Sequence, residues 1–372
     1  MTVTAVEVAG QSAEYEWDAV DATSSFDRVT LYPDTDSRSL DPTSLQEAVH
    51  AAMEKIRPDG VAIPGWSEPA ALAALEWCKE TRTPSIVMSA SSAIDAPRAG
   101  WREWIKGRIV RQFDAGVVGG SLHEDYLVDL GISRDRVFLG YDVVDNAHFA
   151  EGAAIARAEG EALRERYNLP PRYFLGVCRF VPKKNLSRLL YAYAAYRDRA
   201  GGDAWDLVLV GDGPERDAVE RVRTQHGLTE AVRLPGFAQY DDLPIYYGLA
   251  QAFVHASIRE QWGLVVNEAM ASGLPVLISQ RCGCVPDLVH PGENGVAFDP
   301  HDTADLARSL FDTAHGPESV HAMGMASQRI IASWSPARFA DSLSAAALTA
   351  QDNFSSSASP FDRVLLKALM HR

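Results

Sequence analysis

The stretch AFVHASIREQWGLVVNEAMASGLPVLIS, residues 252–279, holds two short apolar runs with a helical segment between them. The runs AFVHA and PVLIS have the composition of buried strands. The segment between them has helical spacing from Gly263 and meets a typical helix stop at Gly273. A strand, a helix and a second strand in this order form a unit whose strands lie parallel in one sheet. The stretch therefore predicts an α/β fold.

The same alternation runs through the rest of the chain. Further strand-like runs are TAVEVA (4–9), RVTLY (28–32), GVAIP (60–64), SIVMS (85–89), AGVVG (115–119), YFLGVC (173–178), DLVLVG (206–211) and AVRLPG (231–236). Helical periodicity is clear over residues 42–56, 185–200 and 336–351. This order favours parallel sheets that are covered by helices.

The length of 372 residues favours two domains. In YNLPPRYF, Pro170 and Pro171 prevent a helix from continuing, and a new strand follows directly. We predict a first domain over 1–168, a second over 169–335, and C-terminal helices and a tail over 336–372 that cross back to the first domain. The tail includes a polar linker, DNFSSSASP. Two α/β domains joined in this way would face a cleft at the carboxyl ends of their sheets.

The overall charge and the cysteines limit the class of protein. The formal net charge is −15, which repels nucleic acid, so we predict no nucleic-acid partner. The chain has neither an apolar run of about 20 residues nor a basic-then-apolar signal pattern, and its four cysteines lack disulfide-type spacing. We therefore predict a cytoplasmic protein. Cys282 and Cys284 could form a redox or metal element, but they have no partner cysteines or clustered histidines, so loop packing is favoured.

Two cations follow a predicted strand in the segment GVCRFVPKKN. Arg179 and Lys184 lie where a helix begins, with Asn185 as its candidate N-cap. Cations and unpaired backbone N–H groups at such a place can bind phosphate oxygens. A solvated basic loop remains the alternative. In VGDGPE, Gly211 and Gly213 allow a tight turn with room for a ligand, although such turns are also common without one.

Two glutamates with seven residues between them flank the helix that begins at Gly263. Glu260 precedes the helix, and Glu268 lies in its second turn. The N–H groups of Gly263, Leu264 and Val265 have no partner within the helix, so a diphosphate could lie there. The carboxylates could then accept hydrogen bonds from hydroxyl groups at its two ends. A loop charge and a satisfied helix residue are the alternative, and the order of cationic loop, glycine turn and carboxylates favours a site.

These segments together resemble the retaining GT-B glycosyltransferases of family 4. The resemblance covers roughly residues 115–310. It rests on the segments LVDLGISRDRVFLGYDVVDNAHF, CRFVPKKN, LVLVGDGPE, VRLPGF, HASIREQWGLVVNEAMASGLPVL and VPDLVHPGENGVAFDPHD. It implies a GT-B fold of two Rossmann-like domains, and transfer of a sugar from a nucleotide-diphosphate sugar to an acceptor hydroxyl with retention of configuration. Such transfer would serve the biosynthesis of glycoconjugates, polysaccharides or glycosylated metabolites.

The resemblance also assigns roles to residues. Arg179 and Lys184 would neutralise the diphosphate, Glu260 would bind the transferred sugar, and Glu268 would hold the ribose. The backbone around Leu234 and Gly236 would meet the base. Further donor-binding candidates are Gly211, Gln261, Gly263, Leu264 and Val265. The resemblance implies no metal and no cofactor, because the nucleotide sugar is a substrate and protein groups supply the positive charge; it does not identify the hydroxyl acceptor.

Three features depart from the family pattern. Gln261 stands where the family often has glycine, which could change the sugar that fits. Ser91 lies near the place of a frequent family histidine. MTVTAVEVAG reads as the second strand of a GT-B domain, so we expect that the chain starts late and lacks a loop near the donor, which would weaken activity.

The segment RAGWREWIKGRIVRQF has an apolar stripe of Trp101, Trp104, Ile105 and Ile109 beside several cations. Residues 98–112 could contact an anionic membrane or a phosphorylated acceptor. We favour a surface helix that docks on the domain through its aromatic side chains.

Two other functions remain open from the sequence. The same fold could carry out nucleotide-sugar epimerisation or hydrolysis. The chain could also be a catalytically weak nucleotide-binding partner subunit.

Overall fold

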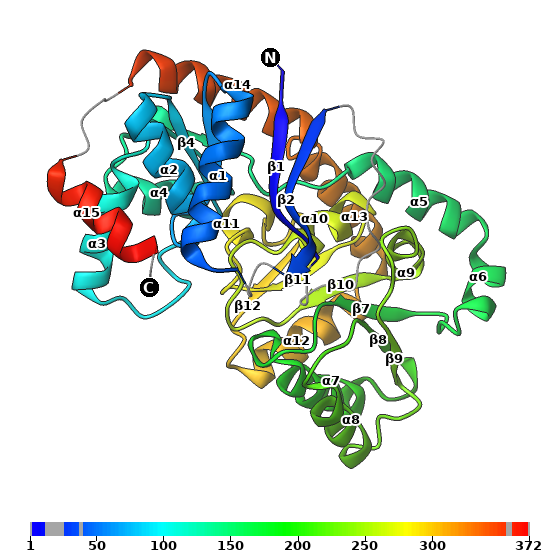
Figure 1. Ribbon diagram of the computed structural model, residues 1–372. Helices are drawn as coiled ribbons and strands as arrows, with labels where there is room; N and C mark the ends of the chain where they lie inside the picture. The colour runs from blue at the N-terminus through cyan, green and yellow to red at the C-terminus, as the bar shows by residue number, and fades with distance from the viewer. Residues whose placement is uncertain (1, 12–25, 37–39, 355–358, 371–372) are drawn as a thin grey trace.

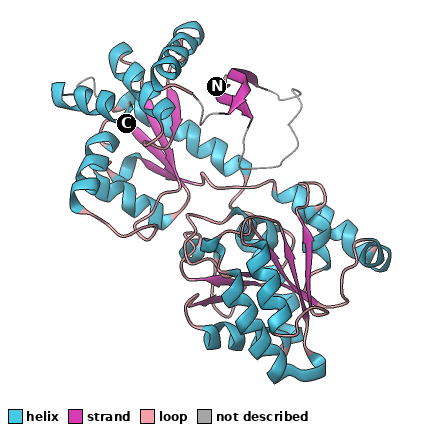
Figure 2. Ribbon diagram, turned by 60° about the horizontal axis from the view of Figure 1, so that its bottom comes forward, coloured by secondary structure: helices cyan, strands magenta, loops and turns pink. Residues whose placement is uncertain are grey.

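The computed structural model describes residues 2–11, 26–36, 40–354 and 359–370. Two parallel sheets form its centre, each covered by helices (Figure 2). The first sheet has the order β3-β4-β5-β6. Its strands are β3 (Val61–Pro64), β4 (Ser85–Ser89), β5 (Ala115–Val118) and β6 (Val137–Leu139). The helices that alternate with them are α1 (Pro42–Ile56), α2 (Pro69–Thr81), α3 (Gly100–Val110) and α4 (Ser121–Leu130).

The second sheet has the order β12-β11-β10-β7-β8-β9, and all of its pairings are parallel. Its strands are β7 (Tyr173–Val177), β8 (Asp206–Val210), β9 (Val232–Gly236), β10 (Ala252–His255), β11 (Val276–Ser279) and β12 (Gly295–Phe298). The strand order reverses between β7 and β10. In open α/β sheets, ligands bind at the carboxyl ends of the strands at this switch point.

Helices cover both faces of the second sheet, so its strands are almost wholly buried. These helices are α5 (Asn146–Ala158), α6 (Gly160–Arg166), α7 (Leu186–Ala200), α8 (Arg216–Gln225), α9 (Leu243–Leu249), α10 (Leu264–Ala271), α11 (Val285–Leu288), α12 (Thr303–Ala314) and α13 (Pro317–Ile331). The helix α10 ends where the sequence predicts, because Gly273 adopts a left-handed conformation with φ of 78°.

The last two helices pack against the first sheet and its helices. Helix α14 (Pro336–Asp352) lies along β4, β5 and β6, and its Ala346 and Ala350 are fully buried there. Helix α15 (Pro360–Met370) packs on α2 and α3 (Figure 1). Part of the predicted linker, residues 355–358, lies outside the described residues. The division of the chain at residue 169 stays a prediction.

The first two strands form a separate parallel pair. They are β1 (Thr4–Gln11) and β2 (Asp27–Asp36), and Val6 and Leu31 pack against the core of the first sheet. Within the described residues, β1 therefore pairs with a strand that follows it in the chain. The hypothesis of a late start stays a prediction.

The α/β fold with two Rossmann-like parallel sheets is confirmed, and each of the ten predicted strands is present. Two further strands, β6 and β12, were not predicted; they have three and four residues and adjoin turns. None of the helices in the described ranges is long and apolar enough to span a bilayer.

One prediction about α3 is wrong. Trp101 and Trp104 are 57% and 54% exposed, so α3 does not dock through its tryptophans. It docks through its C-terminal half, where Ile109 and Val110 are buried. The reason is a close approach at Gly107, where a Cβ atom would lie 3.1 Å from the carbonyl oxygen of Leu130. The helix approaches α4 there, and its first turn projects outward.

Candidate functional site

The central feature of the site is an ion pair at the switch point of the second sheet. Lys184 ends the short turn Pro182–Lys184 that follows β7, and Glu260 lies in the loop that follows β10. Because β7 and β10 are neighbours, their carboxyl ends bring the two side chains together. The Nζ atom of Lys184 donates a hydrogen bond to Oε2 of Glu260, and both side chains are largely buried. The structure thus joins two residues that are 76 positions apart.

Glu260 is held by two further donors. Its Oε2 accepts hydrogen bonds from Nε2 of His255 and Oγ of Ser257, each at 3.1 Å. Burial alone would raise the pKa of Glu260, but the hydrogen bond from His255 and the charge of Lys184 outweigh it and hold the pKa well below its usual range. Burial lowers the pKa of His255. Glu260 is therefore an ionised acceptor at neutral pH.

The backbone around Glu260 is also fixed. Its N–H donates to the carbonyl oxygen of Arg281, and its carbonyl oxygen accepts from the N–H of Gly283 at 3.0 Å. A Cβ atom on Gly283 would lie 1.7 Å from the carbonyl oxygen of Gln261, so only glycine fits there. These contacts fix the backbone conformation of the loop around Glu260.

Asn185 is the N-cap residue of α7, as predicted, but its side chain bonds elsewhere. It occupies the N-cap position of α7 with φ of 59°, but its side chain does not bond to the helix. Its Nδ2 atom donates instead to the carbonyl oxygens of Ala256 and Pro300, at 3.1 and 2.9 Å. These two carbonyl groups, after β10 and β12, orient the side chain away from the start of the helix. Asn185 thereby ties the Lys184 turn to the end of β10.

The first turn of α10 presents backbone donors next to Glu260. Gly263 precedes the helix with φ of 106°, and no side chain of the described residues caps it. The N–H groups of Leu264 and Val265 begin the helix there. Gln261 and Leu264 are exposed, so this helix start is accessible from solvent. Such a terminus favours a bound anion.

Glu268 lies on the same helix but contacts a different partner. Tyr247 on α9 donates from its hydroxyl group to Oε2 of Glu268 at 2.7 Å. Burial raises the pKa of Glu268 to about 7. Glu268 therefore changes its charge near neutral pH.

The remaining predicted residues line the carboxyl ends of β7, β8 and β9. Gly211 has φ of 126°, and a Cβ atom there would lie 1.9 Å from the carbonyl oxygen of Cys178. Its N–H donates to the carbonyl oxygen of Gly236 at 2.7 Å. The carbonyl oxygen of Leu234 accepts from Arg216 at 3.3 Å. Arg179 is exposed directly after β7.

The carboxylate of Asp287, in the domain of the second sheet, caps helix α4 in the domain of the first sheet. Helix α4 begins after Gly120, which has no side chain to cap it. Asp287 of α11 takes this role: its Oδ2 accepts from the N–H and the Oγ of Ser121 at 3.0 and 3.1 Å. A Cβ atom on Gly120 would lie 2.2 Å from the same carboxylate. The glycine is thus what permits the close approach.

His123 makes a second link across this interface. Its Nδ1 accepts from the N–H of Gly120 at 3.1 Å, which leaves Nε2–H to donate to the carbonyl oxygen of Gln261 at 2.9 Å. Burial lowers the pKa of His123, in keeping with a neutral ring. The ring also lies 5.7 Å from that of Trp262. The peptide after Glu260 is therefore held from the first domain.

Several of these residues were missed in the sequence. His255 could have been found, because a histidine at the end of an apolar strand, five residues before Glu260, is unusual. Tyr247, His123 and Asp287 carry no such signal, since only the packing of α9, α4 and α11 brings them to the site. Ser91 lies after β4, and its N–H donates to Oγ of Ser89.

The cysteine pair shows the packing that the sequence favours. Cys282 and Cys284 are free thiols and fully buried, and burial raises the pKa of both. Among the described residues, no group of three or more histidine, cysteine, aspartate or glutamate side chains could hold a metal ion.

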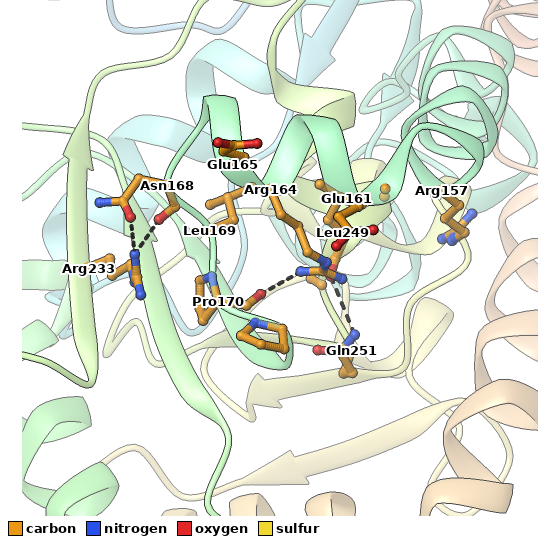
Figure 3. A pocket seen from close by; sticks show the side chains of 14 residues that line it. Arg157, Glu161, Arg164, Glu165, Asn168, Leu169, Pro170, Arg233, Leu249 and Gln251 are labelled. Atoms are coloured by element: carbon orange, nitrogen blue, oxygen red, sulfur yellow. Dashed lines mark hydrogen bonds between the residues drawn. The ribbon is translucent and has the colours of Figure 1, made fainter.

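A cavity of about 950 Å³ lies away from these residues, at the opposite ends of the strands (Figure 3). Arg157, Arg164 and Arg233 line it. Their guanidinium groups donate to backbone carbonyl oxygens of Ser272, Pro170, Leu249 and Asn168. Because these arginines already serve to tie loops together, the cavity does not carry the candidate site.

Comparisons with known proteins agree with this fold. Residues 161–329 match the family described as glycosyl transferases group 1. The chain is 31% identical over 201 residues to the GDP-mannose-dependent alpha-(1-6)-phosphatidylinositol monomannoside mannosyltransferase of Mycobacterium tuberculosis, covering 51% of this chain and 50% of that protein. It is 36% identical over 230 residues to the D-inositol 3-phosphate glycosyltransferase of Salinispora arenicola, covering 59% and 51%. The matches thus span about half the length of these relatives.

A solved structure extends the likeness to both domains. Anabaena HepE, in complex with UDP and glucose, has a TM-score of 0.67 and 18% identity, covering 86% of each chain. At this identity, the likeness shows the fold. Residues 161–329 are therefore similar to the glycosyl transferases group 1 family, and the chain has the GT-B fold of its structural neighbours.

Proposed function

We propose that this protein transfers a sugar from a nucleotide-diphosphate sugar to an acceptor hydroxyl group with retention of configuration. The observation that carries the proposal is the buried pair of Lys184 and Glu260 at the switch point, next to the uncapped start of α10. Cations, backbone donors and an ionised acceptor converge there. A diphosphate with a sugar attached has the complementary groups.

Lys184, Arg179 and the first N–H groups of α10 would bind the diphosphate. Negative charge grows on this group as the glycosidic bond breaks, so fixed positive charge stabilises the transition state more than the ground state. Lys184 forms an ion pair with Glu260. A bound diphosphate would form a second ionic contact with the ammonium group of Lys184. The same positive charge would then hold Glu260 and orient the donor.

Glu260 would hold the sugar. The hydrogen bonds from Lys184, His255 and Ser257 all end on Oε2, and Oε1 accepts none from the described residues. We assign Oε1 to a hydroxyl group of the transferred sugar. Gln261, exposed beside it, would limit which sugar fits.

Glu268 would accept hydrogen bonds from the ribose hydroxyl groups, and the backbone at Leu234 and Gly236 would contact the base. Gly211 would leave room for the nucleotide. Retention is explained by attack of the acceptor on the face that the diphosphate leaves. We further propose that these protein cations make an added metal ion unnecessary, and that the protein works in the cytoplasm, where its four free cysteines would stay reduced.

A donor screen by titration calorimetry tests the proposal. The names of the relatives and the UDP complex of HepE suggest GDP-mannose and UDP-glucose as the first donors. We expect one nucleotide sugar to bind, and its nucleotide to be released only when an acceptor is added. Release or isomerisation without an acceptor would instead indicate a hydrolase or epimerase. Donor binding with no turnover in any acceptor extract would indicate a partner subunit.

A further inference from the structure

Four large apolar side chains form an exposed patch on the first domain. They are Trp101 and Trp104 of α3 and Phe361 and Val364 of α15, here called the α3–α15 patch; they are 57%, 54%, 52% and 66% exposed. The rings of Trp104 and Phe361 lie 5.9 Å apart, and the other two members lie three residues away on the same helix faces. The patch is therefore continuous across two helices. Figure 1 shows α3 and α15 side by side, far from α7 and α8.

Cations surround this patch, although the chain as a whole is acidic. Residues 98–112 carry five arginines and lysines and one carboxylate, whereas the whole chain has a net charge of −15. The guanidinium carbon of Arg102 lies 5.1 Å from the ring centre of Trp101, and that of Arg108 lies 5.5 Å from that of Phe361. On α15, Arg363 and Lys367 are exposed beside Val364.

The carboxylates within this region are already used. Glu103 binds Arg98 and Lys106, and Asp362 binds Arg108. Residues 98–112 and 360–370 together carry seven arginines and lysines and two carboxylates, and Glu76 also pairs with Lys367, so the formal charge of this region stays positive. A self-associating face would place these cations against their own copies, which is unfavourable, so the charge favours an anionic partner.

We propose that the α3–α15 patch binds an anionic lipid surface. Indole rings are most stable at a membrane interface, where the ring is apolar and the N–H stays hydrated. Long cationic side chains that lie over the rings can keep their charges at the lipid phosphates while their stems pack on apolar groups. Aromatic side chains and cations on one face are the composition of helices that lie in the interface plane. The proposal does not depend on which reaction the protein catalyses.

Cosedimentation with lipid vesicles tests the proposal on the full chain. We expect binding to phosphatidylcholine vesicles that contain phosphatidylglycerol, weaker binding in high salt, and little binding to pure phosphatidylcholine. Replacing both tryptophans (Trp101→Ala with Trp104→Ala) should weaken partition by about tenfold or more, since each loses interfacial area. Arg102→Glu should also weaken it.

Two variants elsewhere serve as matched controls. Tyr191→Ala removes an aromatic side chain that is 42% exposed on α7, and Arg221→Glu reverses an exposed charge on α8. Both should bind vesicles as the unchanged protein does. Equal binding by the double tryptophan variant and Tyr191→Ala, or no binding of the unchanged protein to anionic vesicles, would overturn the proposal. A dimer in sedimentation velocity that the double tryptophan variant abolishes would assign the patch to a second copy instead.

Because the tryptophans are exposed, the double variant should keep its fold, and an unchanged Tm checks this. Arg102→Glu keeps both rings and tests the charge separately. Donor binding by calorimetry should be unaffected in both, because the candidate donor residues lie in the second domain.

Discussion

Lys184 and Glu260 neutralise each other in a largely buried contact, so each residue depends on the other for its orientation. Removal of the lysine leaves an ionised Glu260 whose carboxylate has, among the described residues, His255 and Ser257 as its side-chain donors. It also removes the charge that we assign to the diphosphate. The loss of orientation at Glu260 and the loss of charge at the diphosphate would both slow the transfer of the sugar.

We predict that Lys184→Ala and Arg179→Ala each lower turnover by two or more orders of magnitude, as loss of a transition-state donor does. The matched control is Lys183→Ala. Lys183 is exposed in the same turn, and the contact it makes to the N–H of Ile258 uses its backbone oxygen, which the substitution keeps. Steady-state kinetics with the donor found by calorimetry measures the effect. Near-normal turnover in both test variants, or an equal loss in Lys183→Ala, contradicts the assignment.

Glu268 gives a prediction about pH. Its pKa is raised to about 7 by burial, above the ordinary value of 4.5, so the folded state favours the protonated form. The group therefore contributes stability below about pH 4.5, and this contribution is lost as the pH rises through 7. Glu268→Gln keeps an acceptor for Tyr247 without the charge. We expect this variant to have a higher Tm than the unchanged protein at pH 8 and a similar Tm at pH 4.5.

Donor binding should change in the opposite direction with pH. A carboxylate accepts ribose hydroxyl groups better than a carboxylic acid, so nucleotide affinity should fall as the pH drops from 8 to 6, and Glu268→Gln should flatten this dependence. Calorimetry at three pH values measures it. A flat profile in the unchanged protein would argue against contact between Glu268 and the ribose.

The predicted site residues could be read from the sequence because they lie at the carboxyl ends of strands, or in the loops and first helix turns that follow, where chain order fixes their place. Their partners could not. The pairing of Tyr247 with Glu268, and of His123 with the carbonyl group of Gln261, depends on how separate elements pack, and no local pattern encodes it. Arg179 and Lys184 read as equivalent cations in the sequence, yet one is exposed and the other is buried against Glu260.

At the scale of elements, the strands were predictable and the orientation of α3 was not. The strand AFVHA is apolar on both faces because helices cover both sides of a parallel sheet. A continuous apolar run in the sequence therefore identifies it. The stripe on α3 is equally clear, yet Trp101 and Trp104 point to solvent. Periodicity gives the apolar face of a helix, but the length of helix that is buried depends on where its neighbour approaches, here at Gly107.

The helix α4 owes its N-cap to the other domain, and this gives a prediction about domain arrangement. Loss of an N-cap typically costs about 1 kcal/mol. We expect Asp287→Ala to lower the Tm slightly. It should also increase the radius of gyration measured by small-angle X-ray scattering, because the hydrogen bonds that hold Ser121 beside α11 are lost. Asp287→Asn, which can still cap, should change both less.

Asp302 provides the control for this prediction. It caps α12 within the second domain, where its Oδ1 accepts from the N–H groups of Ala304 and Asp305 at 2.9 and 3.1 Å. Asp302→Ala should lower the Tm without a change in the radius of gyration. If Asp287→Ala behaves in the same way, the cap does not link the domains.

At the scale of the whole molecule, the chain crosses between its two sheets and then returns. The helix α14 follows the second sheet in sequence but covers β4, β5 and β6 of the first. Its Ala346 and Ala350 are buried against Ile86, Ala115 and Val117. Alanine is needed at such positions because the helix lies close to the sheet, so the first domain depends on a segment that comes last in the chain.

We predict that Ala346→Asp destabilises the first domain selectively. A buried, unpaired carboxylate costs several kcal/mol, and Ala346 packs in a cluster with the apolar side chains of Ile86, Ala115 and Val117. Calorimetric unfolding should show an earlier transition, and limited proteolysis should cut the first domain first. Nucleotide binding should persist at temperatures below that transition, because the candidate donor residues lie in the second domain. The control is Leu348→Asp on the same helix, where the side chain is 65% exposed and the charge stays hydrated. If nucleotide binding by Ala346→Asp is lost at the first-domain transition, the two domains unfold as one cooperative unit. The cap at Asp287 is then a contact within one cooperative unit and does not link two independent domains.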